Sequence, residues 1–235
     1  MANDYAATER PTAAIEHYRQ AVKLKPNYAQ AHNNLGNLLR SQGQLDDAIR
    51  HFRRALEVEP ASSERHGNLG IALIEQGKLI DAIDAFQQAV NLDSGSAAAH
   101  SNLGNALGMT GNRDQALSHL RKASNLRPDW AQALNGLAWA LATHPDALPG
   151  DIKEAIQCAE KAATTTNHQD ANILDILAAT YAAGGQFEKA MDIAKAAIEI
   201  ATNGKRDAQV DDIRNRLDLY RDSQPYLELT GAPSP

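Results

Sequence analysis

The sequence predicts an all-α fold that is built from repeated pairs of short helices. Alanine is the commonest residue, at 43 of 235, and aromatic residues make up only 5% of the chain. This composition suits closely packed helices and suits a sheet sandwich badly. The third observation is an internal period of 34 residues, which relates the segments 29–60, 63–94 and 97–128 to one another.

Each of these segments reads as two antiparallel helices. In the first segment, apolar residues at steps of three and four place one apolar face on each helix: Leu35 and Leu39 on the first helix, and Ala48, Phe52 and Ala55 on the second. The second helix of the first and third segments is expected to end at Pro60 and Pro128.

Two sets of glycines recur with the same period. The first helix should stop where only glycine adopts the left-handed conformation at little cost, at Gly43, Gly77 and Gly111. A second set, which should let two helix backbones approach closely, comprises Gly36, Gly70 and Gly104.

This recurrence of small and large positions resembles the tetratricopeptide repeat. The resemblance implies a right-handed α–α superhelix, a solenoid in which first helices line a concave groove. On this basis residues 1–28 form a partial repeat with a truncated first helix, and 203–235 form a C-terminal capping helix and tail. Five repeats lie between them, at 29–62, 63–96, 97–130, 131–170 and 171–202, and the fourth carries a loop insertion at 143–150.

The two ends lead to different expectations. Because an incomplete repeat cannot cover its own apolar face, we expect Ile15, Tyr18 and Val22 to show an uncovered side. Self-association through this half-repeat, giving a homo-oligomer, is therefore one alternative function. The C-terminal helix has a single apolar stripe and a charged opposite face, as a capping helix should.

Composition excludes several classes of function. The chain has 23 Lys and Arg against 29 Asp and Glu, a formal charge of -6, which argues against nucleic-acid binding. No apolar run reaches the roughly 18 residues of a membrane helix, so we expect no membrane contact from this segment itself. A soluble segment, with the cytoplasm favoured as its compartment, is expected, and it could still belong to a larger membrane-associated protein.

No catalytic motif, cofactor or metal site is expected. Phosphate-binding loops, nucleophile elbows and paired carboxylates do not occur in the sequence. His32, His66 and His100 recur at the 34-residue period, but equivalent residues of neighbouring repeats should lie roughly 10 Å apart, too far to share an ion. We expect these rings to pack between helices, and Cys158 to be a structural thiol. The chain is therefore predicted not to be an enzyme.

The candidate peptide-binding residues lie on the first helices. Asn34, Asn68 and Asn102 occupy the same position in three successive repeats, and the position becomes Gly136 and Ile176 afterwards. An asparagine amide matches both polar groups of a peptide bond, so this ladder could hold an extended chain of any sequence. Structural or inherited asparagines are the alternative. The polar track would be widened by Asn33, Asn37, Asn105 and Asn135, with apolar specificity from Ile71, Met109 and Trp139.

Two further resemblances bear on function. The repeats are similar to those of O-linked N-acetylglucosamine transferase, whose asparagine ladder holds substrate polypeptides, which would give that role to Asn34, Asn68 and Asn102. The stretch 137–146 and the region 216–226 resemble the end of many bacterial tetratricopeptide proteins, in which the array commonly follows another domain. The chain could therefore be the substrate-docking part of a larger, glycosyltransferase-like enzyme. Binding of acidic chaperone tails is not expected, since the cations required for it are absent.

Overall fold

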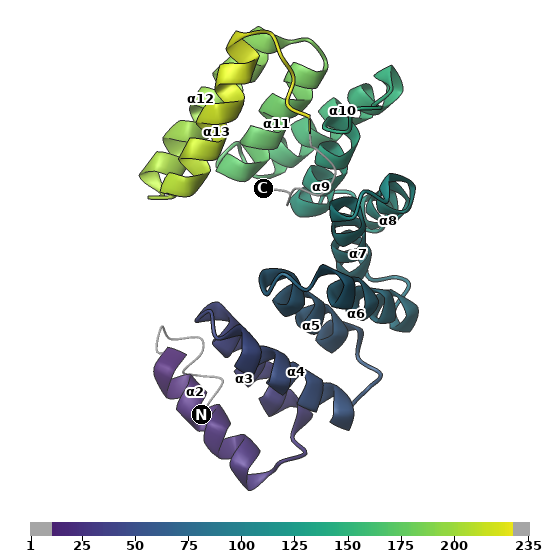
Figure 1. Ribbon diagram of the computed structural model, residues 1–235, viewed down its shortest axis with the longest axis vertical. Coiled ribbons are helices and arrows are strands. Elements are labelled where there is room, and N and C mark those ends of the chain that lie inside the picture. The colour runs from purple at the N-terminus through teal and green to yellow at the C-terminus, as the bar shows by residue number, and fades with distance from the viewer. Residues whose placement is uncertain (1–10, 228–235) are drawn as a thin grey trace. The chain divides into compact units, whose positions relative to one another are not determined.

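The structure is a computed structural model that describes residues 11–227. This part of the chain forms helices and no strand, so the all-α prediction is confirmed. The helices, shown in chain order in Figure 1, are α2 (Pro11–Leu24), α3 (Ala29–Ser41), α4 (Leu45–Val58), α5 (Ser63–Glu75), α6 (Leu79–Leu92), α7 (Ala97–Met109), α8 (Arg113–Leu126), α9 (Ala131–Ala142), α10 (Pro149–Thr165), α11 (Ala171–Ala183), α12 (Phe187–Asn203) and α13 (Asp207–Arg221).

The chain divides into two compact units, Met1–Ala106 (unit 1) and Leu107–Pro235 (unit 2). In unit 1, α3 packs on α4 and α5 packs on α6, which makes two helical hairpins; α4 contacts α5, α3 contacts α5, and α2 lies against α3. In unit 2, α9 pairs with α10 and α11 with α12, while α13 packs on α12. Within each unit the first helices of successive repeats are therefore neighbours, α3 beside α5 and α9 beside α11.

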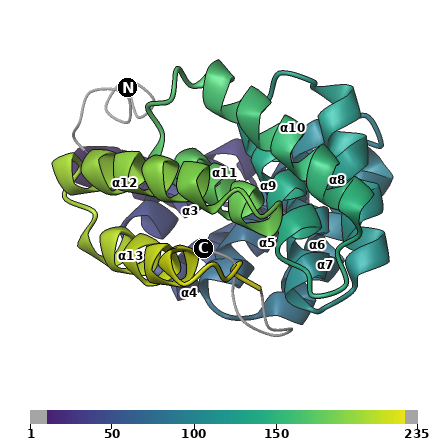
Figure 2. The ribbon, with the colours of Figure 1, turned by 90° about the horizontal axis from the view of Figure 1, so that it is seen from above.

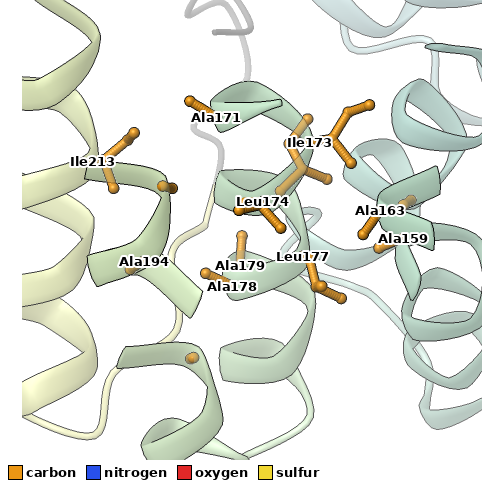
Figure 3. Packing of buried hydrophobic residues seen from close by; sticks show 14 of the residues in the cluster. Ala159, Ala163, Ala171, Ile173, Leu174, Leu177, Ala178, Ala179, Ala194 and Ile213 are labelled. Atoms are coloured by element: carbon orange, nitrogen blue, oxygen red, sulfur yellow. The ribbon is translucent and has the colours of Figure 1, made fainter. Parts of the chain in front are cut away.

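Alanine fills much of the core of unit 2. Figure 3 shows α11 at the centre, with Ala159 and Ala163 of α10 on one side and Ala194 of α12 on the other. These methyl groups are completely buried, and their small size lets the helices approach closely. The abundance of alanine in the sequence thus has a packing role.

The glycines at the ends of first helices have the predicted backbone conformation. Gly43, Gly77 and Gly111 have φ angles of 73°, 79° and 77°, in the left-handed region. The N–H of Gly43 donates to the carbonyl oxygen of Arg40, and the N–H of Gln44 donates to that of Leu39, so the last turn of α3 is closed by the chain that follows it.

Two glycines of the second set, Gly36 and Gly70, lie against aromatic rings. A Cβ atom placed on Gly36 would lie 2.7 Å from Cε1 of Phe52, and one on Gly70 would meet the ring of Phe86 in the same way. Each of these two glycines therefore makes room for an aromatic ring of the paired second helix. Pro60 and Pro128 follow the ends of α4 and α8, as expected.

The predictions for the N-terminal end have mixed outcomes. The truncated first helix of the partial repeat lies largely outside the described residues. Ile15 and Tyr18 of α2 are buried, which corrects the expectation that they show an uncovered side, and Val22 is half-buried. In the described part of the chain, every helix is too short or too polar to cross a bilayer.

The inserted loop leads directly into α10, which begins at Pro149. Asp151, the third residue of the helix, accepts a hydrogen bond from the N–H of Leu148 at 3.2 Å. Glu154 pairs with Arg121 of α8 at 2.7 Å.

Candidate peptide-binding surface

The predicted binding residues of unit 1 lie on the neighbouring helices α3 and α5. We call Asn34, Asn37, Asn68 and Ile71 the first-helix face of unit 1; all four side chains are half-buried. Asn102 and Asn105 follow on α7, where Asn102 is half-buried and Asn105 is exposed.

Asn34 is held by hydrogen bonds to α2 and to its own helix. Its Nδ2 donates to the hydroxyl of Tyr18 at 3.0 Å, and its Oδ1 accepts from Nε2 of Gln30 at 3.0 Å. The bond from Gln30 is solvent-exposed, so a ligand could replace it at little cost. Tyr18 was not predicted to contact the asparagine ladder.

Asn33 and Asn68 join two repeats. Nδ2 of Asn68 donates to Oδ1 of Asn33 at 3.1 Å, from α5 to α3. Asn33 is only 1% exposed, so it is a structural residue that no ligand can reach. Asn68 is half-buried, and in the described part of the chain nothing donates to its Oδ1. One amide hydrogen of Asn68 is therefore committed while its oxygen can still accept.

The candidate residues of unit 2 are less accessible. Asn135 and Trp139 are each 5% exposed, and they lie one turn apart on α9. Met109 is half-buried at the end of α7. Neither Asn135 nor Trp139 offers a free surface as the chain stands.

Trp139 is covered by the chain's own C-terminal segment. After α13 the chain turns back past α11 toward α9 (Figures 1 and 2), and the ring of Tyr226 lies 5.4 Å from that of Trp139, centroid to centroid, at an interplanar angle of 35°. The guanidinium carbon of Arg216 lies 5.5 Å from the Tyr226 centroid. Both distances are in the range of favourable aromatic and cation–π contacts.

Arg216 is itself fixed by a buried ion pair. Its Nε donates to Oδ1 of Asp175 at 3.0 Å, and its Nη2 donates to Oδ2 of the same carboxylate. Asp175 on α11 is 1% exposed and Arg216 on α13 is 6% exposed. The pair therefore ties the capping helix to the last repeat with two hydrogen bonds of fixed geometry.

Burial affects the ionisation of this cluster. Desolvation raises the pKa of the Asp175 carboxyl, although Arg216 acts in the opposite direction. Burial also raises the pKa of the Tyr220 hydroxyl, and the negative charge of Asp175 adds to that effect. Asp175, Arg216, Tyr220 and Tyr226 were all missed as site residues. The available signal was Asp175, a lone acid in an otherwise apolar helix, which requires a buried cation.

The three periodic histidines each bind a backbone carbonyl. The Nε2 atoms of His32, His66 and His100 lie 3.1, 3.1 and 3.2 Å from the carbonyl oxygens of Pro26, Pro60 and Ser94. Because those carbonyl oxygens only accept, each Nε2 carries the hydrogen. The rings thus join the end of one hairpin to the start of the next. No cluster of metal-ligating side chains occurs within residues 11–227.

His32 also contacts a histidine of the paired helix. Nδ1 of His32 lies 2.9 Å from Nδ1 of His51 on α4. Since Nε2 of His32 donates to Pro26, its neutral ring accepts at Nδ1 and His51 donates. Burial lowers the pKa of His32, and burial lowers that of His51 to about 4.

Two other features lie outside the first-helix faces. Burial raises the pKa of the Cys158 thiol to about 11, in keeping with an unreactive thiol. A pocket of about 530 Å³ lies between the inserted loop, α10 and the turn after α11, and its lining includes Pro149, Ile152, Ile156 and Gly184.

Comparisons with known proteins agree with this architecture. No protein of curated function matches the chain. Among solved structures, PilW, described as a widely conserved type IV pilus biogenesis factor, is 19% identical with a TM-score of 0.74, covering 91% of this chain and 94% of its own. YrrB, described as a TPR protein with an unusual peptide-binding site, is 22% identical with a TM-score of 0.59, covering 82% of this chain and 99% of its own. A thermophilic TPR protein of Thermus thermophilus is 22% identical with a TM-score of 0.63, covering 83% of this chain and 98% of its own.

Two sequence profiles place the chain in a family. Both describe the tetratricopeptide repeat; one matches residues 1–64 and 35–99 and the other matches residues 73–140. Together they span more than half of the 235 residues. The helical hairpins, the left-handed glycines and these matches lead to one conclusion: the chain belongs to the tetratricopeptide repeat family.

Proposed function

We propose that this protein is a non-enzymatic interaction module that holds an extended segment of another polypeptide on the first-helix face of unit 1. Tetratricopeptide repeat proteins generally mediate protein–protein interaction. The observation that carries the proposal is the hydrogen bonding of the Asn68 side chain. Asn33 holds one of its amide hydrogens, while its half-buried oxygen accepts nothing from the described part of the chain.

This arrangement suits recognition of a peptide backbone. An amide that is already oriented loses little side-chain entropy when it binds, so more of the hydrogen-bond energy appears as affinity. Asn34 is oriented in the same way by Tyr18. The likeness of the ladder Asn34, Asn68 and Asn102 to that of O-linked N-acetylglucosamine transferase supports the same role, as does the peptide-binding site for which YrrB is named.

A library of random twelve-residue peptides, screened against the full chain, tests the proposal. The variant Asn34→Ala/Asn68→Ala/Asn102→Ala should lose about 1 kcal/mol per hydrogen bond, which for three bonds is roughly a hundredfold in Kd. The matched control is Gln88→Ala/Lys122→Ala, which alters two exposed side chains on the second helices α6 and α8. Equal retention of peptides by the triple variant and the wild type would refute the asparagine-ladder site.

Self-association through the N-terminal half-repeat is the second candidate. The observation that favours it is Leu24, at the end of α2, whose side chain is 87% exposed. Sedimentation equilibrium at several concentrations tests it, with Leu24→Glu as the disrupting variant. A mass that does not change with concentration would remove this candidate.

A further inference from the structure

The C-terminal segment of the chain occupies the position on unit 2 that corresponds to the proposed peptide site of unit 1. Trp139 stands on α9 at the repeat position that Ile71 holds on α5. Tyr226 covers it, while Leu227, the next residue, is 44% exposed. We define Asn135, Trp139 and Asp175 as the first-helix face of unit 2; its Trp139 is thus covered by a segment of the same chain.

Two side chains of unit 2 lie against the Tyr226 ring. Trp139 provides one wall, and the Arg216 guanidinium provides another. Arg216 cannot swing away freely, because the buried Asp175 carboxylate binds it through two nitrogen atoms. A planar ring placed here contacts both an indole and a guanidinium that an ion pair holds in place.

One polar atom of this face remains without a partner. Oδ1 of Asn135 is buried, and no group in the described part of the chain donates to it. In unit 1 the equivalent atom, Oδ1 of Asn33, accepts from Asn68. The residue equivalent to Asn68 on α11 is Ile176, which has no donor. Asn135 lies one turn from Trp139 on the same helix, so a segment bound over Trp139 passes near it.

We infer that the first-helix face of unit 2 binds an extended partner segment through an aromatic side chain, and that Tyr226 is the chain's own occupant of this site. The partner's ring takes the place of Tyr226 against Trp139 and Arg216. Its backbone N–H supplies the donor that Asn135 lacks. This inference rests on the proposed peptide-holding function and adds a second site to it, with a stated preference for an aromatic residue and a competing segment.

The occupancy by Tyr226 has a consequence for affinity. A tethered segment competes as if it were present at about millimolar concentration, the range for short linkers. Only three residues lie between Asp222, just after α13, and Tyr226. A partner must therefore displace the tail, and removal of the Tyr226 ring should raise the apparent affinity for any segment that uses the site.

The test uses the full chain and a synthetic peptide with the sequence of residues 222–235. The variant Tyr226→Ala should bind this peptide at least tenfold more tightly than the wild type, by isothermal titration calorimetry. Tyr226→Phe is the matched control: it keeps the ring and should behave like the wild type. The same peptide with alanine in place of its tyrosine should not bind the Tyr226→Ala variant.

Fluorescence gives an independent readout. The chain has two tryptophans, and Trp139 is the one beside Tyr226. Loss of the ring should shift the tryptophan emission to longer wavelength, and the added peptide should reverse the shift. Tyr226→Leu, which keeps an apolar side chain over Trp139, supplies a second variant should Tyr226→Ala lose helicity by circular dichroism.

The outcomes separate this inference from the proposed function. Equal affinity of the peptide for the wild type and for the variants without the ring, or equal binding of the alanine-containing peptide, would overturn it. The asparagine ladder is tested in unit 1 with library peptides, and the aromatic site is tested in unit 2 with the tail peptide. Failure of one experiment therefore leaves the result of the other intact.

Discussion

Asn68 donates an amide hydrogen to the buried side chain of Asn33, at 3.1 Å, across the boundary between two repeats. The substitution Asn33→Ala should therefore destabilise the protein by about 1–2 kcal/mol, because it removes the hydrogen bond and leaves a small cavity. Urea denaturation followed by circular dichroism measures the change. Asn37→Ala is the control, and its half-buried side chain should change stability by no more than about 0.5 kcal/mol. Equal losses for both variants would contradict a specific role for the Asn33–Asn68 bond.

The buried ion pair of Asp175 and Arg216 predicts a non-additive pair of variants. Asp175→Ala leaves the Arg216 guanidinium buried with its bidentate partner removed, which should cost about 3–5 kcal/mol. The double variant Asp175→Leu/Arg216→Met removes both charges and should be markedly more stable than the single variant. A double-mutant cycle, made of the single variants Asp175→Leu and Arg216→Met and this double variant, measures the coupling by chemical denaturation. Simple addition of the two single effects would show that the charges do not depend on each other.

A side chain at position 36 should clash with Phe52. A methyl group at this position would lie 2.7 Å from Cε1 of Phe52 and 2.9 Å from its Cδ1. Gly36→Ala should therefore destabilise the fold by about 1–3 kcal/mol, since the ring or the helix must shift. Gly67, also inside a first helix, has no atom within 4 Å of such a methyl group. Gly67→Ala should instead stabilise the protein by about 0.5–1 kcal/mol, and thermal denaturation of the two variants compares them directly.

The His32–His51 pair predicts a loss of stability in acid. Burial lowers the pKa of His51 to about 4, and burial lowers that of His32 from its ordinary value of 6.5. Between the folded and unfolded pKa values the unfolded chain binds more protons than the folded chain, so the free energy of unfolding falls as the pH is lowered. From about pH 7 to about pH 5 the pair should lose roughly 1 kcal/mol, after allowance for solvent screening of the half-buried ring.

The measurement is a series of urea denaturation curves across that pH range. His51→Asn is the matched variant, because its amide can donate to Nδ1 of His32 but does not titrate. Its unfolding free energy should depend less on pH than that of the wild type. If the unfolding free energy of His51→Asn depended on pH as strongly as that of the wild type, other groups would be the cause of the acid sensitivity.

Much of the fold could be predicted because residues close together in the sequence determine where each helix ends and which of its faces is buried. Gly43 marks the end of a helix by its backbone conformation, and Leu35 and Leu39 mark its buried face, so a single sequence is enough to place both. The contacts of the asparagines could not be predicted in this way. Asn33 and Asn34 are adjacent in sequence, yet one is buried against the next repeat and the other turns to Tyr18.

The site of unit 2 was harder to predict, for a physical reason. Trp139 was expected to face a partner, and its actual cover, Tyr226, lies 87 positions later in the sequence. No helical period relates the two residues, because the segment after α13 returns over α9 as an extended chain. Asp175 and Arg216 likewise meet across 41 positions. Long-range contacts of this kind leave only indirect signs, such as an acid within an apolar helix.

The histidine contacts have a consequence for how such a chain can change its length. His66 reaches the carbonyl of Pro60, and His100 reaches that of Ser94, so donor and acceptor are always six residues apart. Each of these histidine–carbonyl contacts between successive hairpins therefore forms within a segment of seven residues. Duplication or loss of one whole 34-residue repeat would include both the histidine and its carbonyl partner. Hairpins can therefore be added or removed while these contacts between neighbouring hairpins are kept.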